Sequence, residues 1–242
     1  MKIRLAGLVA IALASFAVSG QAKGTWETTL QARDIDQDGV TDAYFDSTLN
    51  VTWLKDWNYA KSTGYAGANG SGGMSWLSAK TWAENLSIGG YSDWRLPKMT
   101  PVNGVSFNYA FTQDGTSDQG YANTGVGWGL ASEIGHLYYV SLGHSKFSPE
   151  NYPGNSDNRP FQNMFAGSMY WIDHEDAPNP SRAFRFWLGY GEQSSSVKEL
   201  QFAAVAVRDG DVAAVPEPQT YALMLAGLGL IAGIARRRTK QQ

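Results

Sequence analysis

The stretch GGYSDWRLP at residues 89–97 decides how we expect this chain to fold. Its glycine pair ends the regular structure before it, and Pro97 keeps its predecessor out of the helical region. We therefore predict an extended segment over Tyr91–Leu96, with Trp94 packed in the core and Arg95 paired with a nearby carboxylate. A ligand site that uses the fork of the arginine is the alternative. Because breaking a buried arginine pair costs several kcal/mol, we interpret Asp93, Trp94 and Arg95 as a structural motif.

Two helices and several strands are predicted on either side of this stretch. One helix begins after Ser75 and runs to the glycine pair, and the other begins after Ser132 and ends at Gly143. A long polar loop, 102–129, separates them. Strands are expected at Ala43–Phe45, Asn50–Leu54, Met169–Ile172, Arg182–Leu188 and Gln201–Arg208. Two helices in a mainly antiparallel, loop-rich chain predict a single α+β domain.

The end of the chain has the composition of a membrane-directed tail. An uncharged run from Tyr221 to Ala235 would be about 22 Å long as a helix, against a hydrocarbon core of about 30 Å. Flanking residues and local thinning can narrow that gap, so we predict a transmembrane helix over 220–235, with its basic end cytoplasmic. A permanent single-span anchor and a buried core helix are the alternatives. The residues that flank the run are Val215, Pro216, Glu217, Pro218, Arg236, Arg237 and Arg238.

The beginning of the chain is typical of a secretory signal peptide. Lys2 and Arg4 precede the apolar run Leu5–Val18, and small residues follow, so we expect cleavage after Ala22. A retained transmembrane helix is the alternative, but the run is short and no basic stop follows it. The chain has no cysteine, which excludes a disulfide framework and thiol chemistry.

The charge of the exported part argues against polyanionic partners. The chain holds 19 basic and 22 acidic residues, but six of the basic ones lie in the two targeting ends, so residues 23–235 carry a net charge near −9. Nucleic-acid binding depends on clustered lysine and arginine, so we expect no nucleic-acid partner.

The tail resembles the PEP-CTERM sorting signal of exopolysaccharide-producing Gram-negative bacteria. The Pro-Glu-Pro motif, the apolar helix and the arginine run occur in the order of that signal. The resemblance implies a transient membrane anchor, while the signal peptide predicts export across the inner membrane and cleavage by signal peptidase. The resemblance also implies processing by an exosortase-type membrane protease and final placement at the cell surface or outside the cell.

The middle of the chain resembles the Lcl C-terminal domain family, formerly a domain of unknown function (1566). The resemblance covers 43–212 and rests most specifically on GGYSDWRLP. It implies an α+β fold that is C-type-lectin-like or similar to the formylglycine-generating enzymes, without established catalytic residues. The expected organisation is a signal peptide at 1–22, a lead-in segment at 23–42, the Lcl-like domain at 43–212 and the sorting signal at 213–242. Further matching strings are YxD (44–46), LNxTWLxD (49–56), MSW (74–76), ExGHL (133–137), PFxN (160–163), YW (170–171) and VAVRxGDV (205–212).

An acidic loop in the lead-in segment is a candidate calcium site. Asp34, Asp36 and Asp38 alternate, a glycine stands at the sixth place, and Asp42 follows at the ninth. Alternate carboxylates converge on a hard cation, and the glycine permits the sharp turn. The twelfth place holds Phe45 instead of the usual glutamate, so a solvated acidic turn is the alternative.

Catalytic patterns are weak, and we expect no enzymatic activity. The three histidines have no zinc-like spacing. The acidic cluster around His174 (Asp173, Glu175 and Asp176) has the minimum of two carboxylates that glycoside hydrolysis needs. A hydrolase acting on polysaccharides is therefore the rival hypothesis, and a purely structural envelope protein without a ligand is a third.

Aromatic residues in glycine-rich loops are the candidate ligand-facing groups. A flat ring is apolar yet tolerates polar neighbours, so it suits a sugar face. We therefore predict that exopolysaccharide is a binding partner, with the alternative that these rings pin the loops to the core. The candidates are Trp57, Tyr65, Tyr109, Tyr121 and Trp128.

Overall fold

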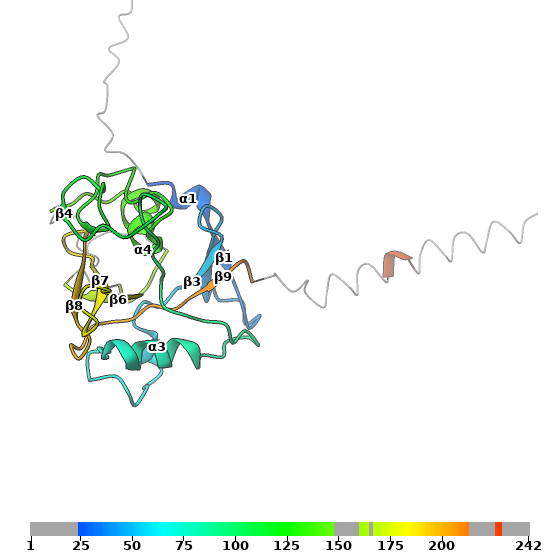
Figure 1. The fold of residues 1–242 in the computed structure, drawn as a ribbon. Coiled ribbons are helices and arrows are strands. Elements are labelled where there is room, and N and C mark those ends of the chain that lie inside the picture. Colours follow the sequence, from blue (N-terminus) through cyan, green and yellow to red (C-terminus); the bar gives the residue numbers. More distant parts are fainter. Residues whose placement is uncertain (1–23, 148–159, 165–166, 213–225, 229–242) are drawn as a thin grey trace, which may run out of the picture.

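The computed structural model describes residues 24–147, 160–164, 167–212 and 226–228 (Figure 1). The signal peptide expected at 1–22, the sorting motif at 215–218 with its arginines at 236–238, and most of the helix expected at 220–235 lie outside these ranges. Among the described helices, none combines the length and the apolar composition that are needed to traverse a bilayer.

The first sheet is formed by four antiparallel strands: β1 (Leu30–Arg33), β2 (Ala43–Asp46), β3 (Val51–Leu54) and β9 (Val207–Asp209). Their order is β1-β2-β3-β9. The predicted strands at 43–45 and 50–54 are confirmed, and Tyr44 pairs with Trp53. Asn50 makes the turn with a φ of 54°, which asparagine tolerates better than most residues. The lead-in segment supplies β1 and is therefore part of the domain.

The second sheet is formed by five strands: β4 (Phe111–Thr112), β5 (Gln119–Gly120), β8 (Glu192–Val197), β7 (Arg182–Trp187) and β6 (Met169–Glu175). Adjacent strands are antiparallel except β4 and β5. The strands predicted to begin at Met169 and Arg182 are confirmed. Two sheets rich in antiparallel pairs, together with helices, confirm the predicted α+β class.

The described helices are α1 (Trp26–Thr29), α2 (Tyr59–Ser62), α3 (Trp76–Glu84), α4 (Glu133–His136) and the π-helix η1 (Leu137–Ser141). Both predicted N-caps are confirmed. The Ser75 hydroxyl accepts a hydrogen bond from the N–H of Ser78, and the Ser132 hydroxyl accepts one from the N–H of Gly135.

The predicted stop of the first helix at the glycine pair is wrong, because α3 already ends at Glu84. Gly89 and Gly90 instead form a two-residue turn with φ values of 57° and 87°. Ile88 and Tyr91, on either side, exchange two backbone hydrogen bonds of 3.0 Å. Two successive positive φ values suit a tight hairpin turn, and glycine adopts them without a steric penalty.

The strand predicted over Gln201–Arg208 is wrong for most of its length. Phe202 and Ala203 make only single bridges, and regular pairing begins at Val207. The sequence pattern also missed β8, whose serine run 194–196 has little of the β-branched and aromatic character of most strands. These small side chains lie beside the large residues of β7, and Ser195 pairs with Phe184.

Two buried clusters fill the domain. The first lies between the sheets and joins Trp53 of β3 to Phe184 of β7 and Tyr138 of η1. The second cluster lies beneath α3 and contains Trp82 of that helix together with Trp94. Figure 1 places the sheets on opposite sides, with α3 below and α4 above. The structure therefore presents two outer faces, one on each sheet.

Candidate functional site

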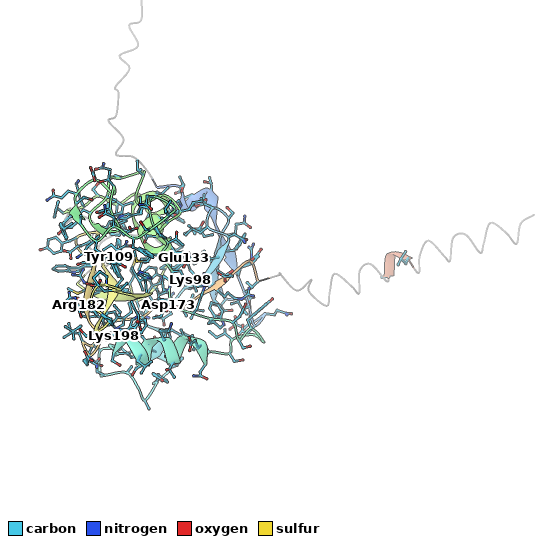
Figure 2. The ribbon with its side chains drawn as sticks, in the orientation of Figure 1. Lys98, Tyr109, Glu133, Asp173, Arg182 and Lys198 are labelled. Carbon is cyan, nitrogen blue, oxygen red and sulfur yellow. The ribbon has the colours of Figure 1, made fainter. Side chains whose placement is uncertain are left out.

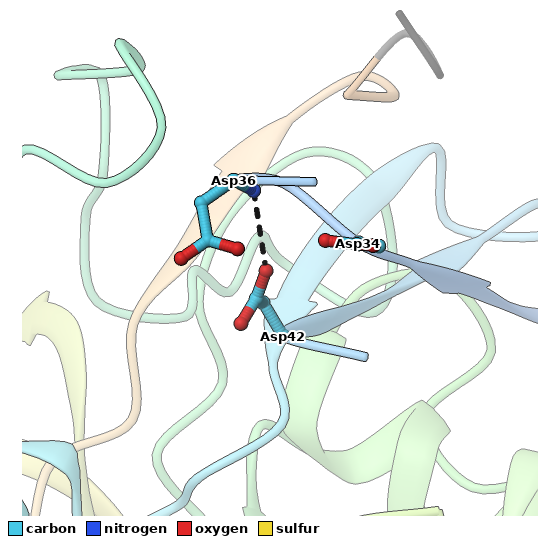
Figure 3. A group of neighbouring side chains, drawn as sticks. All are labelled: Asp34, Asp36 and Asp42. Carbon is cyan, nitrogen blue, oxygen red and sulfur yellow. Dashed lines mark hydrogen bonds between the residues drawn. The ribbon is translucent and has the colours of Figure 1, made fainter. Parts of the chain in front are cut away.

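The acidic loop between β1 and β2 brings three of its four aspartates together. One carboxylate oxygen from each of Asp34, Asp36 and Asp42 lies within 4.8 Å of the others. Figure 3 shows the three side chains around one small region. Such a set of hard oxygen ligands suits a divalent cation such as calcium.

Backbone N–H groups hold these carboxylates in place. Asp34 Oδ1 accepts from Gln37 N at 2.8 Å and Oδ2 accepts from Gly39 N at 2.8 Å. Asp42 Oδ2 accepts from Ile35 N at 2.7 Å. Partial burial raises the pKa of Asp42, and the negative charges of Asp36 and Asp34 add to that effect. A bound cation would reverse this repulsion.

The fourth aspartate of the loop stands outside the group. Asp38 Oδ1 accepts a hydrogen bond of 2.7 Å from the N–H of Val40, and no oxygen of Asp38 belongs to the three-carboxylate cluster. Phe45, at the twelfth place, lies under the guanidinium of Arg33 at 5.5 Å. The structure therefore assembles the first, third and ninth positions of the calcium pattern.

The GGYSDWRLP stretch makes its contacts inside the domain. Trp94 is 2% exposed. Asp93 accepts two hydrogen bonds of 2.8 Å from Arg208 on β9. Arg95 forks onto Glu133 at the start of α4 and also pairs with Asp209. Asp93 and Arg95 therefore connect the stretch to β9 and α4, and Trp94 is buried in the core beside them.

A second contact reinforces that junction from the neighbouring residue. The backbone N–H of Lys98 donates to Glu133 Oε2 at 2.7 Å, and the two residues lie close together in Figure 2. Glu133 therefore accepts hydrogen bonds from both Arg95 and Lys98. These bonds fix residues 95–98 to the first turn of α4.

Three of the five candidate ligand-facing aromatics are buried, so that prediction is wrong for them. Trp57 is completely buried between Phe161 and Tyr170, with ring centroids 5.4 and 5.0 Å away. Trp128 is 3% exposed, and its indole N–H donates to a backbone carbonyl. Tyr121 is 9% exposed. The burial of these large apolar rings stabilises the fold more than exposure on a loop would.

The other two candidates are partly exposed. Tyr65 packs against the cluster under α3, and Tyr109 packs against Phe107 and Phe184 with centroids 6.1 Å away. Burial of the Tyr109 ring raises the pKa of its hydroxyl. Both rings therefore help to pin loops, although part of each stays accessible.

The most exposed aromatic rings are ones that the sequence interpretation left out. Phe111, Phe147 and Tyr190 are 52%, 46% and 39% exposed. Their position in polar, glycine-containing segments was a usable signal. Two of the three are phenylalanines, which have no polar group to mark them as ligand-facing.

The histidines are dispersed among core and loop contacts. His136 is buried, and its Nδ1 lies 2.9 Å from the carbonyl of Gly129. His174 lies between Phe107 and Phe184, and this burial lowers its pKa from 6.5. Within the described ranges, no histidine belongs to a group of residues that could hold a metal ion.

The acidic residues around His174 are engaged by neighbouring side chains. Asp173 pairs with Lys80 on α3. Glu175 pairs with Lys198 at 2.7 Å, and Asp176 accepts a hydrogen bond of 2.6 Å from Ser195. These contacts connect β6 to α3, and the end of β6 to β8 and to Lys198 directly after it.

The comparisons with known proteins identify the tail. The family described as the PEP-CTERM protein-sorting motif matches residues 214–238. No curated protein and no solved structure matches the chain. The motif indicates exosortase-dependent sorting of an exported protein whose C-terminal signal is anchored in the membrane. An exosortase is therefore a partner that fits this chain.

Proposed function

We propose that this chain is an exported, exosortase-processed protein of the surface or extracellular matrix of a Gram-negative bacterium, where it binds exopolysaccharide without modifying it. The observation that carries this proposal is the sorting motif at 214–238, attached to one compact α+β domain. The signal that the tail resembles belongs to exopolysaccharide-producing bacteria, so a domain sorted outside such a cell meets that polymer.

The engagement of the carboxylates supports a role without catalysis. The candidate acids for glycoside hydrolysis, Asp173, Glu175 and Asp176, are each bound to a lysine or a hydroxyl. Glycoside hydrolysis needs one acid that can give up a proton and a second carboxylate across the bond. These contacts favour binding over the rival hydrolase.

We also propose membership of the Lcl C-terminal domain family, with its C-type-lectin-like fold. The support comes from the position of its most specific string. Asp93 and Arg95 meet partners from α4 and β9, which are the elements that carry two other matching strings, ExGHL and VAVRxGDV. Residues that match together in sequence thus make contact in space.

Calcium is the proposed ligand of the acidic loop. Three carboxylates within 4.8 Å of one another, at the first, third and ninth places of a calcium pattern, support this assignment. In this proposal the ion stabilises the β1–β2 connection and takes no part in chemistry.

Two measurements on the full chain test the proposed function. The purified chain in detergent should be retained by exopolysaccharide extracted from a biofilm matrix, and no new reducing ends should form. Turnover that is lost in Asp173→Asn or Glu175→Gln would instead favour the hydrolase.

In cells, Glu217→Ala should block processing and leave the protein in the membrane fraction, whereas Gln241→Ala should be processed as usual.

A further inference from the structure

A group of four aromatic rings, three of them exposed, lies at the end of the second sheet, near β4, β5 and the β7–β8 turn. It consists of Phe111, Tyr121, Phe147 and Tyr190, which we call the aromatic patch. The ring centroid of Tyr121 lies 5.5 Å from that of Phe111 and 4.2 Å from that of Phe147. The N–H of Phe147 donates to the carbonyl of Tyr190 at 3.2 Å. Phe111, Phe147 and Tyr190 are more than one third exposed, and the rings of Phe111 and Phe147 both pack on the buried ring of Tyr121.

The chain holds one of these rings in an unfavourable backbone conformation. Phe147 has a φ of 57°, in the left-handed region that bulky residues avoid. Contacts of its neighbours keep it there. Lys146 Nζ donates to the carbonyl of Gln113, and Ser145 bonds to Thr124 at 2.9 Å. Strain that is maintained at a residue that is still 46% exposed points to a functional position.

The charges beneath the aromatic patch are balanced. The Tyr121 hydroxyl donates to Glu192 Oε2 at 3.1 Å, and Glu192 Oε1 accepts from Arg185 Nη2 at 2.7 Å. The side chains of this ion pair are only 9% and 13% exposed. A ligand on the patch therefore meets aromatic rings above the paired Arg185 and Glu192, with Lys146 as a single cation beside Phe147, and this complements a ligand without clustered charge.

The aromatic patch also lies away from the membrane attachment. The described domain ends at Val212, just after β9 in the first sheet, and the patch lies on the second sheet at the opposite side (Figure 1). Only eight residues separate Val212 from the start of the apolar run at Tyr221. Their length, at most about 30 Å, limits how far a tethered domain can lie from the bilayer.

We infer that the aromatic patch binds the apolar faces of neutral sugar units in an extracellular polysaccharide. This inference rests on the proposed function and assigns it a place and a ligand class. A pyranose ring presents C–H groups on one face and hydroxyls at its edge, so adjacent aromatic rings can stack on successive sugars while the hydroxyls stay hydrated. Aliphatic patches suit protein partners better, since they lack flat stacking surfaces.

Affinity electrophoresis of the full chain in mild detergent tests this inference. The probes are gels that contain a neutral mixed-linkage β-glucan or a glucomannan, with dextran sulfate as the charged comparison. Phe111→Ala and Phe147→Gly should each weaken retention by the neutral polymers about five- to tenfold. Phe147→Gly removes the backbone strain but also the ring contact with Tyr121, so its melting temperature is measured beside that of the wild type, and retention is compared only for folded protein. Phe147→Tyr should be retained like the wild type, and so should Leu130→Ala, which changes an exposed residue outside the patch.

The possible outcomes distinguish failure of the aromatic patch from failure of the proposed polysaccharide binding. Retention of the wild type together with unchanged retention of Phe111→Ala and Phe147→Gly would overturn the patch and leave polysaccharide binding intact. Retention by dextran sulfate alone would overturn the neutral ligand class. Absence of retention on every polymer, including matrix exopolysaccharide, would overturn both. If no polymer retains the wild type and Phe147→Gly changes the oligomeric state, the patch is a contact between copies of this chain.

Discussion

Arg95 and Glu133 meet in a two-pronged ion pair, with Nη1 2.8 Å from Oε2 and Nη2 2.7 Å from Oε1. Their side chains are only 12% and 14% exposed. Arg95→Ala leaves Glu133 nearly buried without its main partner, so we expect the free energy of unfolding to fall by about 3–5 kcal/mol. Urea unfolding followed by tryptophan fluorescence measures this change.

Lys98→Ala is the matched control for that prediction. Lys98 pairs with Asp209 at 3.6 Å, and both side chains are largely exposed, so its removal should change stability by about 0.5 kcal/mol or less. If Arg95→Ala unfolds at the same urea concentration as Lys98→Ala, the interpretation of the GGYSDWRLP stretch as architecture is refuted.

Asp46 at the end of β2 gives a second prediction. It is completely buried, and its Oδ1 accepts hydrogen bonds from the N–H groups of Thr48 and Leu49. Burial raises its pKa above the ordinary 3.8. Asp46→Asn keeps an acceptor oxygen and stays neutral, so it should be as stable as the wild type or more stable at pH 7. Asp46→Ala loses both bonds and should be less stable by about 2–4 kcal/mol.

The dependence of Asp46 on pH follows from the direction of its shift. A carboxyl whose pKa is raised by folding contributes stability below the unfolded pKa of 3.8, and this contribution is lost as the pH rises through the folded pKa. Any gain in the free energy of unfolding of Asp46→Asn over the wild type should therefore be largest near neutral pH and vanish below pH 3.8. Urea unfolding of both proteins between pH 3 and pH 7.5 measures it, and an advantage that persists below 3.8 contradicts the account.

His174 predicts a pH dependence at milder acidity. Its burial between Phe107 and Phe184 lowers its pKa from 6.5, so the unfolded chain takes up a proton before the folded one does. Stability should be complete above pH 6.5 and decline as the pH falls from there through the folded pKa. The slope cannot exceed about 1.4 kcal/mol per pH unit for one proton, and partial exposure of the ring reduces it.

His174→Phe isolates that contribution, because a phenylalanine keeps the ring packing and cannot take up a proton. Thermal unfolding at pH 7.5, 6.5, 5.5 and 4.5 should give a smaller loss of stability on acidification for His174→Phe than for the wild type. Parallel curves for the two proteins would mean that His174 titrates alike in the folded and unfolded chains.

Short-range signals predicted the parts of the fold that depend on neighbouring residues. Ser75 and Ser132 mark helix starts because each hydroxyl caps an N–H three residues later. The turn at Gly89 and Gly90 was identified as a break, although its hairpin geometry was not. The α+β class followed from the mixture of these elements.

Long-range contacts decided the parts that could not be predicted. Trp57 stands next to a polar loop, but Phe161 and Tyr170, over a hundred residues later, enclose it. The serine run of β8 became a strand only because β7 lies beside it. The polar segment around Phe111 indicates exposure, whereas its contact with Tyr121 depends on the fold.

The acidic loop gives the last prediction, which is that calcium stabilises the chain. Loops of extracellular modules bind calcium with dissociation constants of about 10⁻⁴–10⁻³ M. At 10 mM calcium the folded state should gain up to about 2.7 kcal/mol, and the melting temperature should rise. Asp36→Asn and Asp42→Asn should lose this rise, whereas Asp114→Asn, on another exposed loop, should keep it.

A bound ion would also act on the chain that leads to the sorting motif. Arg33, directly before the loop, holds Asp211 by two hydrogen bonds of 2.7 Å. A cation that orders the loop therefore orders the last described residues before the tail, and calcium should slow proteolytic cleavage there as well as raise the melting temperature. Calorimetry that finds no heat at 10 mM calcium, with an unchanged melting temperature, would leave the loop as a solvated acidic turn in which Asp36 and Asp42 only cap backbone N–H groups.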